Sequence, residues 1–110
     1  MKKEIIGVIP PIITPIDEHE KVDEQGLRRL INHCISHGIH GIFSCGSNGE
    51  CMSLTQRQRD EAIRITLDEC AGRVPVIAGC MDSSTARVIE NIKRFEDMGG
   101  KTAVGTPVFY

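Results

Sequence analysis

Several features that would point to particular partners are absent from this sequence. Among its 110 residues there is no tryptophan and one tyrosine, and the formal net charge is only −2. Lysines and arginines are scattered along the chain, so there is no basic stripe for nucleic acid and no polybasic segment for a membrane surface. No apolar run approaches the roughly 18 residues that cross a bilayer. We therefore expect no nucleic acid or membrane partner, and a cytoplasmic location.

The cysteine pattern also lacks the usual signals. The chain has five cysteines, an odd number, with no Cys-x-x-Cys pair and no histidine at the spacing of a zinc finger. Both common nucleotide-binding glycine signatures are missing as well. We expect reduced thiols, no metal site and no cofactor. On this interpretation, the following cysteines are small buried residues: Cys45, Cys51 and Cys80. Three histidines are surface or packing residues: His33, His37 and His40.

What is present is an alternation of β-branched apolar runs with segments of helical period. The apolar runs begin at about residues 5, 39, 74 and 101, and a spacing of roughly 30 residues is typical of a βαβ unit. This order predicts an α/β fold with parallel strands. Both an open doubly wound sheet and a (β/α)₈ TIM barrel fit the pattern, and the chain holds only about the first three and a half βα units of a barrel.

The element boundaries follow from caps, glycines and prolines. The prolines at positions 10, 11 and 15 predict short or irregular pairing for the first strand. A capping box of Thr55 with Gln58, or of Ser53 with Gln56, predicts the start of the second helix, and Asp82 or Ser83 that of the third. The expected strands span 5–14, 39–44, 74–79 and 101–108, and the expected helices span 23–37, 55–70 and 83–98.

The loop Cys45–Glu50 is the most polar strand end. Two glycines, a hydroxyl, an amide and main-chain N–H groups here form either a structural turn or a cradle for a small anion. No lysine lies near to neutralise a polyphosphate, so a carboxylate fits better than a nucleotide. For Glu50 we expect a carboxylate that shapes the turn by bonding backbone N–H groups, rather than a catalytic one. The Thr14 hydroxyl is expected to bond the neighbouring loop.

An ordered set of short motifs covers essentially the whole chain. These are Thr14-Pro15, Val22-Asp23, the run 38–42, the loop 46–50, the helix start 53–55, the strand 75–79 and Thr106-Pro107. Together they resemble the N-terminal part of the dihydrodipicolinate synthase and N-acetylneuraminate lyase family. The resemblance implies the TIM barrel, with residues 1–110 as the N-terminal part of a single barrel domain. It also implies a homo-oligomer, a dimer or a tetramer.

The resemblance further implies class I aldolase chemistry, in which a lysine forms a Schiff base with pyruvate or another 2-keto acid. Gly46, Ser47, Asn48 and Gly49 then hold the substrate carboxylate, and the Ser47 hydroxyl joins a proton relay with tyrosines. Asn48 departs from the threonine common in the family, although its amide can still donate a hydrogen bond.

Two parts of that site are not settled by the sequence. The family's Thr-Pro-aromatic-aromatic motif places a relay tyrosine where Phe109 stands, so either Tyr110 takes the role after a shift of one residue or the relay is altered. The Schiff-base lysine and the main relay tyrosine belong to later strands. We therefore expect the 110 residues alone to be inactive. The alternatives are a non-catalytic barrel-derived fragment or interaction module, and an open-sheet hydrolase or phosphate-binding enzyme.

Overall fold

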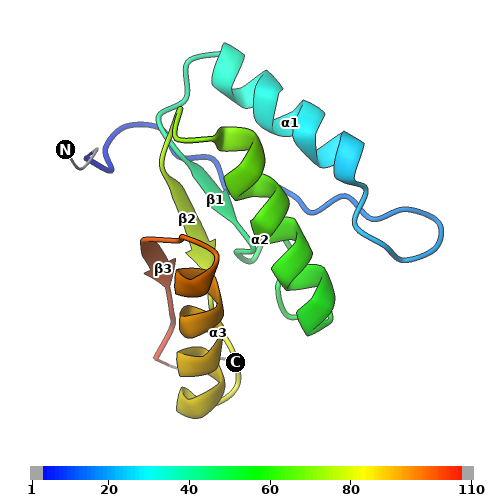
Figure 1. The fold of residues 1–110 in the computed structure, drawn as a ribbon, viewed down its shortest axis with the longest axis vertical. Coiled ribbons are helices and arrows are strands. Elements are labelled where there is room, and N and C mark those ends of the chain that lie inside the picture. Colours follow the sequence, from blue (N-terminus) through cyan, green and yellow to red (C-terminus); the bar gives the residue numbers. More distant parts are fainter. Residues whose placement is uncertain (1–3, 108–110) are drawn as a thin grey trace.

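The computed structural model describes residues 4–107 as a three-stranded parallel sheet with three helices. Neighbouring strands are consecutive in the chain and are joined by helical crossovers (Figure 1). This confirms the α/β fold and the parallel strands. In chain order the elements are α1 Glu24–Ser36, β1 Ile42–Ser44, α2 Gln56–Cys70, β2 Val76–Gly79, α3 Thr85–Asp97 and β3 Thr102–Val104.

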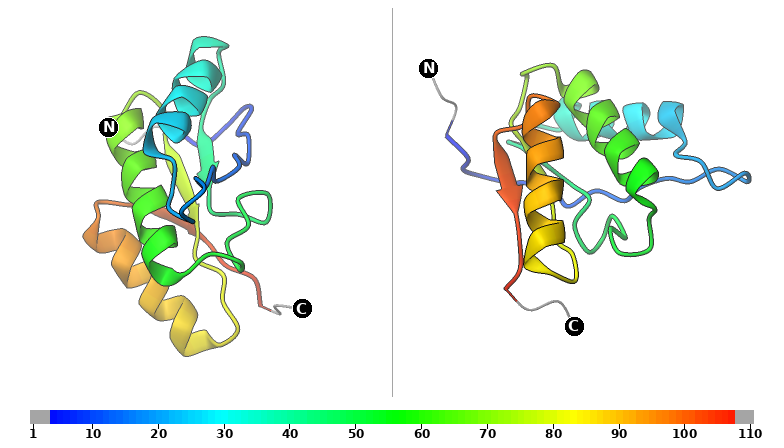
Figure 2. Two further views of the ribbon diagram at one scale, coloured as in Figure 1. Left: turned by 90° about the vertical axis from the view of Figure 1, so that its right-hand side faces the viewer. Right: turned by 60° about the horizontal axis from the view of Figure 1, so that its bottom comes forward.

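The register of the sheet brings the carboxyl ends of the strands to one edge. Ser44 of β1 pairs with Ala78 of β2, and Gly79 of β2 pairs with Val104 of β3. The helices lie together on one face of this sheet (Figure 2). The loops that follow the strands therefore share an edge, which is where parallel α/β proteins bind ligands.

The first apolar run lies beside β1 but forms no regular strand, so the predicted strand at 5–14 is wrong. Only a single parallel bridge joins Pro11 to Phe43. The Phe43 N–H donates to the Pro10 carbonyl at 3.1 Å, and the Ile12 N–H donates to the Phe43 carbonyl at 3.0 Å. Two successive prolines have no N–H to donate, so the ladder is interrupted there, as the sequence indicated.

The named strands are shorter than expected. The predicted start of β1 at residue 39 is wrong, because the His40 N–H bonds the Val8 carbonyl while pairing with the next strand begins only at Ile42, whose N–H bonds the Pro75 carbonyl. Pro75 has no N–H, so β2 begins one residue after it rather than at residue 74. β3 ends at Val104, and the predicted end at residue 108 lies outside the described residues.

Side chains cap the starts of α1 and α2. Asp23 caps α1 by accepting the Gly26 N–H. Thr55 caps α2 in a capping box, in which its hydroxyl accepts the Gln58 N–H at 3.1 Å and the Gln58 side chain accepts the Thr55 N–H at 2.8 Å. The Thr55 alternative is therefore confirmed. α2 ends at Ala71, which adopts a left-handed φ of 46° one residue before the expected Gly72.

The start of α3 corrects the sequence prediction. Its cap is Ser84, whose hydroxyl accepts the Arg87 N–H at 3.2 Å, rather than Asp82 or Ser83. The Asp82 carboxylate accepts instead from two buried side chains, Arg59 of α2 and Asn91 in the middle of α3. Phe95 of α3 is buried, while Ile89 and Ile92 on the same helix stay exposed.

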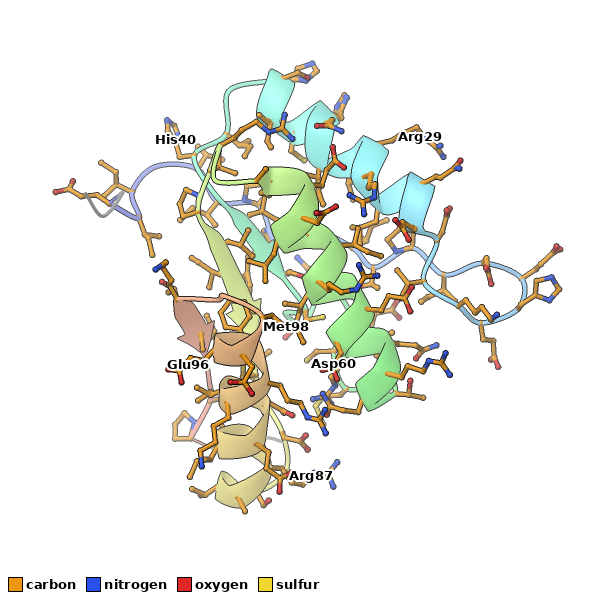
Figure 3. All side chains as sticks on the ribbon, in the orientation of Figure 1. Arg29, His40, Asp60, Arg87, Glu96 and Met98 are labelled. Carbon is orange, nitrogen blue, oxygen red and sulfur yellow. The ribbon has the colours of Figure 1, made fainter. Side chains whose placement is uncertain are left out.

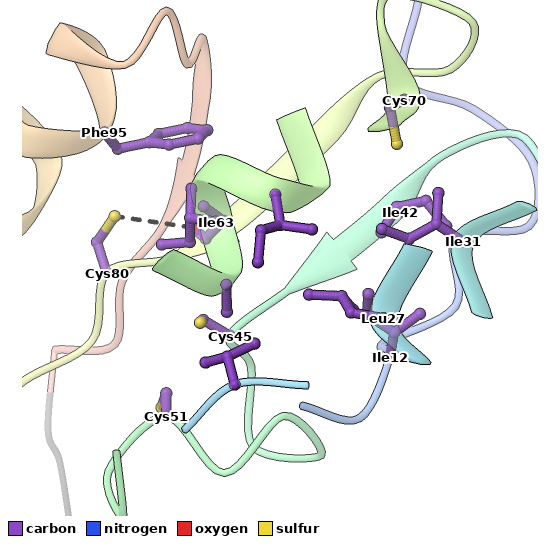
Figure 4. Packing of buried hydrophobic residues seen from close by; sticks show 14 of the residues in the cluster. Ile12, Leu27, Ile31, Ile42, Cys45, Cys51, Ile63, Cys70, Cys80 and Phe95 are labelled. Carbon is purple, nitrogen blue, oxygen red and sulfur yellow. Dashed lines mark hydrogen bonds between the residues drawn. The ribbon is translucent and has the colours of Figure 1, made fainter. Parts of the chain in front are cut away.

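The core lies between the sheet and the helices. Figure 4 shows Leu27 and Ile31 of α1 packing near Ile42 of β1, with Phe95 of α3 close to Ile63 of α2. All five of these side chains are buried. No helix in residues 4–107 is long and apolar enough to cross a membrane. The core fixes the positions of the strand ends and thus of the loops that follow them.

Candidate active-site loop

The loop after β1 exposes its two polar residues and buries its two glycines. Ser47 and Asn48 are exposed, whereas Gly46 and Gly49 are buried. The Glu50 N–H donates to the Ser47 carbonyl at 3.0 Å, which closes the turn. The structure therefore brings the four predicted substrate-binding residues together at the carboxyl edge of the sheet.

The turn leaves main-chain donors free at its tip. Within residues 4–107, the N–H groups of Ser47 and Asn48 donate no hydrogen bond, and neither do their side chains. Two successive N–H groups with an adjacent hydroxyl and amide form a set of donors for a small anion. The flanking residues Cys45 and Glu50 adopt left-handed φ angles of 56° and 58°. Such backbone conformations are uncommon outside glycine and concentrate at functional sites.

The two glycines allow neighbouring atoms to lie close to the main chain of this loop. A Cβ on Gly46 would meet the Phe43 ring at 2.8 Å, and a Cβ on Gly49 would meet the Ile12 carbonyl oxygen at 3.1 Å. Neither glycine has a positive φ among the residues that the structure describes. A side chain at Gly49 would therefore press against main-chain atoms, and the turn would have to shift to make room for it.

Thr14 anchors the loop from the first apolar run. Its buried hydroxyl donates to the Gly49 carbonyl at 2.8 Å. This confirms the prediction that the Thr14 hydroxyl bonds the neighbouring loop. The bond satisfies a carbonyl that the turn itself leaves without a partner, and it holds the loop to a segment that is 35 residues distant in the sequence.

Glu50 acts through its main chain and not through its carboxylate. Its side chain is exposed and makes no hydrogen bond with residues 4–107, so the prediction that the carboxylate shapes the turn is wrong. Its N–H bonds the Ser47 carbonyl, and its own carbonyl accepts the Ser53 N–H at 2.9 Å. The main chain of Glu50 alone closes the turn, and the N–H groups of Ser47 and Asn48 stay free.

A buried ion pair behind the loop had no signal in the sequence. The Arg59 and Asp82 side chains are only 8% and 3% exposed, and their charged groups lie 3.3 Å apart. Arg59 also donates to the Met81 carbonyl at 3.2 Å and to the Met52 sulfur at 3.4 Å. It thus connects α2 with the segment that precedes α2 and the segment after β2.

Asp82 is the centre of this cluster. Besides Arg59, its carboxylate accepts from the Arg87 Nε at 2.8 Å, the Asn91 amide at 3.2 Å and the Ser83 N–H at 2.8 Å. Figure 3 shows Arg87 on the first part of α3. Burial raises the pKa of Asp82, but these donors outweigh burial and lower the pKa from 3.8 to about 2. The carboxylate is therefore ionised and acts as a structural acceptor.

The cysteines near the loop are inert. Cys45, Cys51 and Cys80 are all buried, which confirms their predicted packing role. Burial raises the pKa of Cys45 to about 12 and that of Cys80 to about 11. Thiols with such pKa values are poor nucleophiles near neutral pH. Residues 4–107 contain no group of three or more potential metal ligands.

Other predicted features of the site lie elsewhere. Phe109 and Tyr110 are outside the described residues, so the relay prediction remains a prediction. Among the described lysines, Lys21 is in an exposed turn, Lys93 is on the exposed side of α3, and Lys101 is at the amino end of β3. None of these three lies at the carboxyl end of a strand.

Comparison with known proteins agrees with this arrangement. Residues 4–110 match the model of the dihydrodipicolinate synthetase family. The chain belongs to this family. Within the family, the 4-hydroxy-tetrahydrodipicolinate synthase of Methanopyrus kandleri is 35% identical over 108 residues, which is 97% of this chain. The alignment covers 36% of that relative, so the chain spans about a third of the length of the curated relatives it matches.

Solved structures of dihydrodipicolinate synthase family members share the fold. The synthase from Bacteroides thetaiotaomicron superposes with a TM-score of 0.91 and 34% identity, covering all of this chain and 37% of that one. A prophage protein of the family from E. coli K12, solved in complex with pyruvate, superposes with a TM-score of 0.90 and 30% identity, covering 94% and 35% of the two chains. The three-stranded α/β fold therefore corresponds to part of their fold.

Proposed function

We propose that this chain supplies the substrate-carboxylate loop of a pyruvate-dependent class I aldolase or lyase with a complete (β/α)₈ barrel. The observation that carries the proposal is the set of free donors at the loop tip. Ser47 and Asn48 each offer an N–H group and a polar side chain at the carboxyl edge of the sheet. A 2-keto-acid carboxylate has two oxygens that such neighbouring donors can bind together.

The chemistry requires a lysine from another part of the complete protein. Its amine condenses with the keto carbon of the substrate and releases water, and the resulting Schiff base accepts the electron pair of the adjacent carbon–carbon bond. The part of this chain is to bind and orient the carboxylate. The Ser47 hydroxyl also carries a proton in the relay, with Tyr110 as its tyrosine partner.

The loop favours a carboxylate over a phosphate ester. It has no lysine or arginine at its tip, and the guanidinium group of Arg59 behind it is buried and already paired with Asp82. A doubly charged phosphate would remain largely unneutralised there. Family membership also favours the barrel over the open-sheet alternative. The oligomeric state and the cytoplasmic location remain predictions.

The test is reductive trapping with pyruvate and sodium borohydride, followed by mass measurement of the intact protein. We expect no adduct on the 110-residue chain. We expect one reduced pyruvyl group when the chain is completed with the downstream residues of the Methanopyrus kandleri relative. In that completed protein, removing the Ser47 hydroxyl removes one carboxylate ligand and the relay proton, so Ser47→Ala should lower trapping and turnover by about 10- to 100-fold.

The matched control is Ser53→Ala, which removes an exposed hydroxyl from the same loop. It should trap pyruvate as well as the parent protein does. Absence of an adduct on a folded, completed protein would overturn the imine chemistry. Equal losses in the Ser47 and Ser53 variants would overturn the assignment of the loop, since no specific role would then belong to Ser47.

A further inference from the structure

Two histidines share one face of α1 at its carboxyl end. His33 and His37 are four residues apart, so a single helical turn places one side chain above the other. Both residues are exposed, and their ring centroids lie 4.3 Å apart with the ring planes tilted by 39°. Two imidazoles that are this close and face solvent can direct ring nitrogens at one point.

Hydrogen bonding fixes the state of the His37 ring. Its Nδ1 lies 2.8 Å from the His33 carbonyl oxygen and 3.2 Å from the Ser36 Oγ, and the Ser36 hydroxyl already donates to that same carbonyl at 2.8 Å. A carbonyl can only accept, so Nδ1 carries the proton and the Nε2 lone pair of neutral His37 faces outward. Histidines that bind metals commonly donate their second ring N–H to a carbonyl in this way. The His33 ring has no hydrogen-bond partner in residues 4–107 and is free to turn toward the same point.

The electrostatic setting suits a cation. His37 is the C-cap of α1, where the helix dipole and the last carbonyls present partial negative charge. Arg29 lies one turn before His33, and its side chain extends from α1 into solvent (Figure 3), while Arg73, which bonds the neighbouring Asn32, is paired with Glu69. A guanidinium in open solvent is screened by salt and opposes a bound cation only weakly.

We propose that His33 and His37 form a two-histidine chelate for a divalent transition-metal ion of the zinc, nickel or copper class. Imidazole nitrogen is a preferred ligand of these metals, and histidines at i and i+4 of a helix are the spacing by which helical zinc sites hold their metal. Water completes the coordination, since the described residues gather no third ligand. The site lies where α1 leads into the amino end of β1, remote from the substrate loop, so it is independent of the proposed aldolase function.

The experiment is a calorimetric titration of the untagged 110-residue chain with nickel ion alone. The buffer is reducing and slightly alkaline. We expect one nickel ion per chain. Because chelation depends on both rings, His33→Ala or His37→Ala should each weaken binding by roughly 10- to 100-fold. The double variant should be no weaker than either single one. Both side chains are exposed, so helix content by circular dichroism should stay unchanged.

The matched control is His19→Ala, which removes an exposed histidine from the loop before α1 and should bind nickel as the parent chain does. Parent-like binding by either α1 variant would overturn the proposal. So would an equal loss in the His19 variant, or binding that disappears only when the cysteine thiols are alkylated. Any of these results would assign the nickel to other ligands.

Discussion

The Thr14 hydroxyl donates a buried hydrogen bond of 2.8 Å to the carbonyl oxygen of Gly49, and this bond attaches the loop Cys45–Glu50 to the first apolar run. Replacing Thr14 with valine keeps the shape but leaves the carbonyl without a donor, which should lower the free energy of unfolding by about 1–3 kcal/mol. Urea denaturation measures the change. Thr14→Ser retains the hydroxyl and should lose much less, so equal losses in the two variants would mean that the bond contributes little.

Gly49 is closely surrounded by main-chain atoms. An added Cβ would lie 3.1 Å from the Ile12 carbonyl oxygen and 3.2 Å from the Cys45 nitrogen, both of which are main-chain atoms. Gly49→Ala should therefore destabilise the chain by about 1–3 kcal/mol through overpacking, as measured by thermal or urea denaturation. Gly105→Ala is the control, because its nearest neighbour is a Val88 methyl carbon at 3.8 Å. A harmless Gly49→Ala would show that the loop can shift freely.

The buried Asp82 should make stability depend on acidity. Its pKa is lowered from 3.8 to about 2 in the folded chain, so the unfolded chain binds the proton more readily. The stabilisation is present above pH 4 to 5 and is lost as the pH falls toward 2, with a total of roughly 2 kcal/mol. We expect the advantage of the parent chain over Asp82→Asn, measured by urea midpoints, to shrink over this range. A constant difference between pH 6 and pH 2.5 would contradict the assignment.

The cysteines should differ sharply in reactivity. Cys34 is only partly buried, whereas Cys45, Cys70 and Cys80 are buried and their pKa values are raised to between about 11 and 12. Brief treatment of the folded chain with iodoacetamide at pH 8 should label Cys34 first, and peptide mass spectrometry identifies the site. In urea all five should react. Early labelling of Cys45 would show that the loop opens readily.

The sequence predicted local structure correctly where residues close together in the chain determine it. The predicted capping box of Thr55 and Gln58 is completed within four residues, and the structure has it. The prolines at 10 and 11 likewise predicted the broken pairing of the first run. The family motif placed Ser47 and Asn48 in one loop, and the structure exposes both of them at the strand end.

What the sequence did not reveal depends on partners far along the chain. Arg59 stands among polar helix residues and gives no sign of burial, because its partner Asp82 lies 23 residues later. That same partnership removed Asp82 from the role of helix cap and left Ser84 to begin α3. For the His33 and His37 pair, the i and i+4 spacing was visible, but the hydrogen bond that fixes the His37 ring was not.

The tight contact between Gly79 and Cys45 has a consequence for how this site can change. A Cβ on Gly79 would collide with the Cys45 carbonyl, so β2 and the start of the loop meet backbone to backbone. β2 and the start of the loop can therefore stay this close only while residue 79 is glycine. Substitutions at Ser47 or Asn48 leave this contact untouched, because it involves neither side chain.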